Sequence, residues 1–164
     1  MHLKELFDYK NNLMKDICTN PDIVSLVSDK EYTDKLGKAL AYSQVFPYEF
    51  VPETIDNAQT IICFDVDIDR VQNKTFYTPV IYIWVFTHKS LLKLTKGGVR
   101  LDEISIKIDE MLNGNRFYGL GELDLQNVSR FLPINDYQGR VLTYTARDFN
   151  RSQGKRIPAN RKNP

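Results

Sequence analysis

The sequence predicts an α+β domain in which N-terminal helices precede a β-β-α-β-β core, with a mixed or antiparallel sheet and one helix packed on a face. Three observations predict this class. Side-chain polarity alternates along residues 61–69, which is typical of a half-buried strand. β-branched and aromatic residues fill residues 77–88, which indicates a second strand. Apolar residues then recur at spacings of three and four over residues 101–112, which indicates a helix with one apolar face.

The chain has 164 residues, enough for one domain with a single core. We expect this domain over residues 1–149, divided into a helical part (1–41), a loop rich in aromatic residues and proline (42–59) and the core (60–149). The net charge of +1 makes no general case for nucleic-acid or membrane binding. Residues 150–164 hold five basic side chains and no acidic ones, so the rest of the chain is mildly acidic and the end is predicted to be a flexible basic tail.

Within the first predicted strand, the even-numbered residues 62–68 are apolar and are expected on the buried face. Cys63 and the three aspartates at odd positions are expected on a wet, acidic face. Residues 70–75 suit a hairpin connection. The second strand is apolar on both faces, so we expect it in the centre of the sheet, with Pro79 tolerated only near its start.

The helix over residues 101–112 has favourable ends. Asp102 and Glu103 lie in its first turn, where the helix dipole favours negative charge, and Asn113-Gly114 is a stop signal. In the strand that follows, Leu123, Leu125 and Val128 are expected to face inward. The other expected elements are helices over residues 3–18 and 22–27, a weakly helical stretch over 28–42, strands over 122–128 and 140–147, and a connection over 133–139.

Three aspartates on one strand face are the sharpest candidate for chemistry. On one strand face, consecutive members of the set Asp65, Asp67 and Asp69 would lie roughly 6.5–7 Å apart. This is close enough for them to share a divalent cation if other residues also contribute ligands. An EF-hand loop is excluded, because the sixth position from Asp65 is not glycine and the twelfth is Phe76. A solvated strand face without a ligand explains the same pattern, and we favour it.

Two other stretches have alternative interpretations. The aromatic loop around Phe46, Tyr48 and Phe50 is expected either to pack over the body or to contact a partner. The basic tail, with Arg151, Lys155 and Arg156, can contact a neighbouring subunit, bind nucleic acid by releasing counterions, or stay solvated. Cys18 and Cys63 are expected as reduced thiols.

The helix with Asp102 and Asp109 ends in Leu-Asn-Gly and so resembles that of phage-borne Holliday-junction resolvases. The resemblance implies a magnesium-dependent endonuclease as the alternative function. In those enzymes a further acidic pair follows the helix, whereas this sequence continues Asn115-Arg116-Phe117-Tyr118. A structural role for both aspartates is therefore favoured.

Residues 42–151 resemble the tail terminator or tail-completion proteins of tailed bacteriophages. The matching features are the proline-bounded aromatic loop (46–52), the strand with alternating aspartates, the run Tyr82-Ile83-Trp84-Val85-Phe86-Thr87-His88, the helix 102–112 and the closing segment 137–151.

This resemblance implies a structural virion protein and not an enzyme. It would need no cofactor or metal, and would form a ring of six copies at the head-proximal end of the tail. The ring would assemble in the cytoplasm of the host bacterium and join the tail-tube protein to the head connector, without a membrane. DNA would pass through it without sequence recognition. Asp65, Asp67 and Asp69 are the candidate channel lining, and Phe46, Tyr48, Phe50, Arg151, Lys155 and Arg156 are the candidate subunit contacts.

Overall fold

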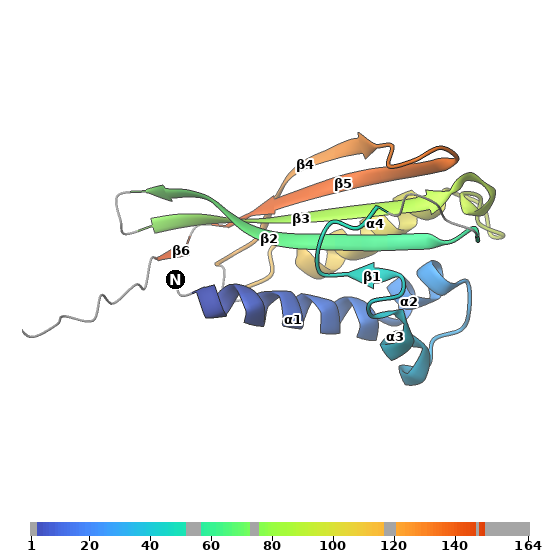
Figure 1. Ribbon diagram of the computed structural model, residues 1–164, viewed down its shortest axis with the longest axis horizontal. Helices are drawn as coiled ribbons and strands as arrows, with labels where there is room; N and C mark the ends of the chain where they lie inside the picture. Colours follow the sequence, from blue (N-terminus) through green and yellow to red (C-terminus); the bar gives the residue numbers. More distant parts are fainter. Residues whose placement is uncertain (1–2, 52–56, 73–75, 117–120, 147, 150–164) are drawn as a thin grey trace, which may run out of the picture.

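The computed structural model describes residues 3–51, 57–72, 76–116, 121–146 and 148–149. It confirms the α+β class, with helices packed on one face of a mixed sheet (Figure 1). The four α-helices are α1 (Leu3–Thr19), α2 (Pro21–Ser28), α3 (Asp34–Leu40) and α4 (Arg100–Leu112).

Short polar residues set where the helices begin. The side chain of Asn20 accepts hydrogen bonds from the backbone N–H groups of Asp22 and Ile23, and so caps α2 directly after α1 ends. Thr33 caps α3 by accepting from the N–H of Leu36. These caps explain why the chain turns twice within the helical part without losing helical structure.

The prediction that residues 28–42 are only weakly helical was too cautious, because α3 is a regular helix there. Gly37 lowers its intrinsic helix propensity but allows it to pack against α1. A Cβ atom at this position would lie 2.1 Å from the carbonyl oxygen of Cys18, a distance that no side chain tolerates. Close packing of two helices therefore outweighs the propensity penalty of glycine.

The sheet has the order β1-β2-β3-β5-β4. Its strands are β1 (Val45–Phe46), β2 (Thr60–Gln72), β3 (Phe76–His88), β4 (Asp124–Phe131) and β5 (Tyr137–Thr145). All neighbours are antiparallel except β1, which lies parallel to β2 at Ile62 and Cys63. A sixth strand, β6 (Asp148–Phe149), pairs with the start of β3, and a single 3-10 turn follows β3 (Lys89–Leu91).

Several strands differ from the predictions. β2 continues to Gln72, inside the expected hairpin connection 70–75, and β4 spans residues 124–131 where 122–128 was expected. The short strands β1 and β6 were not predicted, because two residues are too few to show a period. β5 begins at Tyr137, within the expected connection 133–139. Gly139 weakens the strand pattern there, so the start of β5 was missed. The glycine is nevertheless required inside the strand, because a Cβ at this position would lie 2.8 Å from the carbonyl oxygen of Val85.

β3 is central, as predicted, and Pro79 lies where the sheet can accept it. The neighbouring strand β5 ends at Thr145, opposite Val80, so Pro79 faces no β5 residue that needs its missing N–H. Its carbonyl oxygen still accepts from the N–H of Ala146 at 3.3 Å. The proline therefore lies where the pairing of β3 with β5 ends, and its missing N–H affects only the last bond there.

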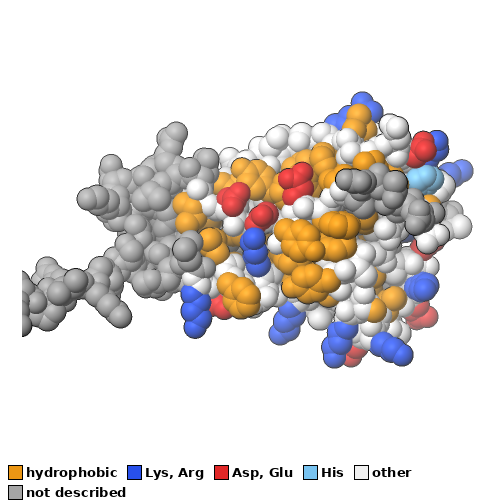
Figure 2. Space-filling view, in the orientation of Figure 1, with side chains coloured by type: hydrophobic (Ala, Val, Ile, Leu, Met, Phe, Trp, Pro, Cys, Tyr) orange, Lys and Arg blue, Asp and Glu red, His pale blue; other side chains and the backbone are white. Residues whose placement is uncertain are grey.

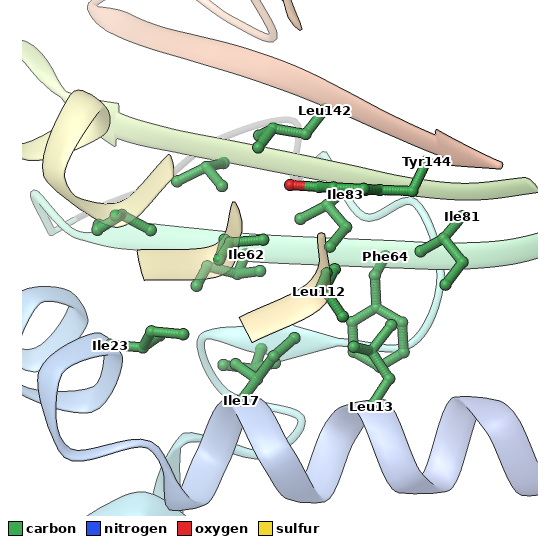
Figure 3. Close-up of a cluster of buried hydrophobic side chains, with 14 of the residues drawn as sticks. Leu13, Ile17, Ile23, Ile62, Phe64, Ile81, Ile83, Leu112, Leu142 and Tyr144 are labelled. Carbon is green, nitrogen blue, oxygen red and sulfur yellow. The ribbon is translucent and has the colours of Figure 1, made fainter. Parts of the chain in front are cut away.

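The main core lies between the sheet and the helices, and Figure 3 shows side chains from both layers pointing toward one another. Leu13 and Ile17 of α1 meet Phe64 of β2, and all three are fully buried. Arg100 is the one charged side chain among the described buried residues, at 4% exposure. It bonds to the carbonyl oxygens of Leu26 and Leu91, and joins the end of α2 to the start of α4.

Candidate functional site

The two faces of the sheet are different. Helices α1, α2 and α4 cover one face, and no described helix covers the other, which we call the open face. Strand register identifies its side chains, because directly opposed residues share a face. The open face carries Cys63, Asp65 and Asp67 of β2, Val80, Tyr82, Trp84 and Phe86 of β3, Val141, Thr143 and Thr145 of β5, and Asp124, Asn127, Ser129 and Phe131 of β4. Among the positions of this face whose side chains the structure describes, three are acidic and none is Lys or Arg; Arg70 opposes Thr78 on the same face, but its side chain lies outside that description.

One end of the open face is closed by a second, smaller core. Phe46, Ile61 and Phe86 are buried there, with Tyr137 from the start of β5. Phe50 stacks on Phe46 with ring centroids 4.2 Å apart. The aromatic loop is thus an apolar cover over this end, and the rest of the face stays without one in the described structure.

Asp65 and Asp67 lie where the alternation predicted, on the open face. The side chain of Asp67 is exposed, whereas that of Asp65 is half-buried and forms an ion pair with Lys10 of α1. The carboxylate of Asp65 also accepts a hydrogen bond of 2.7 Å from the backbone N–H of Val66. Asp69 belongs to β2, but its side chain lies outside the described part of the chain.

Cys63 does not share the wet environment predicted for it. Its side chain is 1% exposed, because the aromatic loop covers it, and its Sγ donates to the carbonyl oxygen of Phe50 at 3.3 Å. Burial raises the pKa of this thiol to about 11, and burial raises the pKa of the Cys18 thiol to about 11 as well. Both cysteines are free, as expected.

The three aromatic contact candidates have different surroundings. Phe46 and Phe50 pack on the sheet, which matches the packing alternative, whereas Tyr48 is 45% exposed. Tyr42, at the start of the same loop, is 63% exposed. Figure 2 shows an apolar patch over this loop, with acidic side chains along β2 beside it. The tail candidates Arg151, Lys155 and Arg156 lie outside the described residues.

The carboxylates of α4 are held by β5. Asp102 accepts a 2.7 Å hydrogen bond from Nε of Arg140, and Asp109 accepts a 3.0 Å bond from the hydroxyl of Tyr144. Burial and the nearby Asp109 raise the pKa of Tyr144, so this hydroxyl keeps its proton. Within the described ranges, no group of three His, Cys, Asp or Glu side chains is placed to hold a metal ion.

The sequence predictions missed an exposed apolar site beside β4. Val128 was expected to face inward but is 43% exposed, because α4 packs mainly on β3 and β5 and leaves β4 uncovered. Ile106, on the same flank of α4 as Asp102 and Asp109, is 51% exposed. The spacing of three between Leu125 and Val128 was the available signal, since it indicates the bulge that the register shows there.

The model of the YomW family matches residues 3–146, and the chain therefore belongs to the YomW family. Among curated proteins, none matches the chain. In the described part of the chain, no helix combines the length and the apolar character that a bilayer span requires.

Proposed function

With membership of the YomW family as the premise, we propose that the chain is a structural subunit that forms a ring with copies of itself. Its resemblance to tail terminator proteins points to a ring of six copies in a tailed-phage virion. This ring closes the head-proximal end of the tail tube, joins it to the head connector and lets DNA pass.

The open face is the observation that carries the proposal. Where its side chains are described, it carries Asp65, Asp67 and Asp124 but no basic side chain. DNA binds proteins mainly through Lys and Arg contacts to phosphate, so a surface of this composition does not hold DNA. A channel through which DNA slides needs that property, and we assign the open face to the channel wall.

The surroundings of the acidic residues on α4 support a structural role over the resolvase alternative. Asp102 is neutralised by Arg140, and Asp109 is held by Tyr144. A nuclease that used these carboxylates to bind magnesium would have to break both contacts first. Their present partners instead fix α4 to β5 and so keep the sheet rigid.

Imaging of the purified full chain by negative-stain electron microscopy tests the ring, alone and with the tail-tube protein. Annular particles are the expected result. A protein that stays monomeric beside every other component of the particle would contradict the proposal.

Charge reversal on the open face tests the channel wall. Asp67→Lys places one new basic side chain per copy on this face, so the ring should gain affinity for double-stranded DNA at low salt. The matched control is Asp8→Lys, because Asp8 is an exposed acidic residue on α1, on the helix side. If both variants bind DNA equally, the open face does not line the channel.

A further inference from the structure

The sheet has two outer edges, and hydrogen bonds identify which backbone groups point out of them. In β2 the N–H of Ile62 donates to the carbonyl of Gln44 beside β1, so even-numbered residues of β2 point outward as far as Ile68, where a bulge shifts the register. The carbonyl of Thr60 agrees, since it accepts from the side chain of Gln44. β1 covers this edge only at Ile62 and Cys63, so residues 64–72 have no described strand beside them.

The same alternation, carried through the registers of β3 and β5, gives the outward groups of β4. Val128 and Arg130 point out of the sheet, and Ser129 points toward β5. Leu125, on the other side of the bulge in β4, also points outward, because its N–H donates at 3.3 Å to the side chain of Asn113 and not to β5. Beyond Leu125, no described residue pairs with the outer edge of β4.

The two edges match in direction and length. Three successive antiparallel pairings separate β2 from β4, so the two strands run in opposite directions. A copy related by rotation about an axis along the strands therefore presents its β2 antiparallel to β4, and the pattern repeats without interruption around a ring. Each edge is regular over a similar length, because β2 alternates without interruption over residues 64–68, before its bulge, and β4 does so over residues 127–131, after its own.

Side chains at the edges are complementary. Val128 and Arg130 lie on the helix side of β4, both exposed, with Ile106 of α4 at the same level. On β2, the carboxylate of Asp65 reaches the edge itself, since it bonds to the outward N–H of Val66 and to Lys10 from the helix side. The β4 edge thus carries the positive charge of Arg130, and the β2 edge carries the negative charge of Asp65.

We propose that the outer edge of β4 pairs with residues 64–68 of β2 in a second copy of this chain, so that the sheet continues from subunit to subunit. This inference rests on the proposed ring and identifies its interface. It requires a heterologous contact, in which each copy uses β4 on one side and β2 on the other.

The variant Val128→Pro tests the pairing. It removes the outward N–H of Val128 and leaves the hydrogen bonds between β4 and β5, so the fold should persist and the oligomer should be lost. Val128→Thr is the matched control, because it keeps the N–H and the β-branched shape, and it should assemble as the unaltered chain does. Light scattering after size-exclusion chromatography measures both.

Hydrogen exchange of the unaltered chain gives a second measurement that needs no variant. Assembly should slow exchange at the amides of Val128 and Arg130 and also at Phe64 and Ile68. This result supports the pairing even if Val128→Pro fails to fold. Protection of the β4 amides alone, or rings of Val128→Pro at unaltered yield, would overturn it while the ring proposal stands. If the unaltered chain forms no ring with any particle component, the proposed function fails first.

Discussion

The β2 edge and the β4 edge belong to one sheet but are protected differently. At β2, the short strand β1 covers one end, and the Asp65 carboxylate and Lys10 occupy the next positions. At β4, Asn113 caps Leu125, and beyond it the described edge presents Val128 and Leu132 to solvent. Natural proteins protect edge strands with charges and covering segments, because an exposed edge pairs with other chains. The β2 edge is therefore guarded against unspecific pairing, whereas the β4 edge, with Val128 and Arg130 exposed and no described segment over them, is the edge that needs a partner strand.

The difference extends to the side chains beneath each edge. Under β2, α1 buries Phe64 and Val66, so this edge is part of the main core. Under β4, Leu125 packs against the main core, but Val128 stays exposed. Changes at β2 should therefore act mainly on folding, and changes at β4 mainly on association.

The largest expected effect is on stability at β2. Phe64→Ala removes a fully buried ring and should lower the free energy of unfolding by about 3–5 kcal/mol, because a cavity remains. Val128→Ala should change it by less than about 0.5 kcal/mol, since the side chain is exposed. Urea denaturation of both variants measures the contrast. Equal losses would show that the two edges contribute alike to the core.

Removal of the carboxylate that protects β2 should have a smaller effect on stability and a visible one on association. Asp65→Ala frees the N–H of Val66 and breaks the Lys10 contact, at a cost of about 1 kcal/mol or less because the pair is partly exposed. The freed edge should aggregate more readily, as measured by static light scattering. Asp67→Ala is the control, since the exposed Asp67 has no described contact at that edge. Equal aggregation of the two variants would contradict a protective role.

The smallest expected effect is a pH dependence of the stability that comes from Cys63, on the open face. Burial raises the pKa of Cys63 to about 11 from an ordinary value of 9.0, so the folded state holds the proton more tightly than the unfolded chain. The resulting stability is complete below pH 9 and is lost as the pH rises toward 11. Thermal melts of Cys63→Val should show a weaker decline over this range. An unchanged decline would assign it to Cys18 or to the tyrosines.

The parts of the fold that the sequence predicted are those with a regular period. Helix α4 and the alternation of β2 were predicted because a single stripe or face decides their burial. Cys63 and Val128 were misplaced for the opposite reason. Their exposure depends on whether a distant segment, the aromatic loop or α4, covers that place in the sheet. Periodicity says which side a residue faces and not what lies above it.

The candidate site was predicted in the same partial way. The acidic face of β2 follows from alternation, whereas its continuation across β3, β5 and β4 needs the strand order and register. The partners Arg140 and Tyr144 of the α4 aspartates also come from β5, about 35 residues further along the chain. No local pattern links these positions, so their roles became clear only in the folded chain.

Cross-linking of the two edges tests the central claim most directly. The double variant Ile68→Cys with Arg130→Cys places one reactive thiol on each edge, and the native cysteines are buried. Treated with a short bifunctional thiol reagent, the assembled protein should give a ladder of covalent species that ends at the closed ring, and neither single variant should give more than trace cross-linking. Covalent dimers from Arg130→Cys alone would contradict the account, because they would show that β4 pairs with itself.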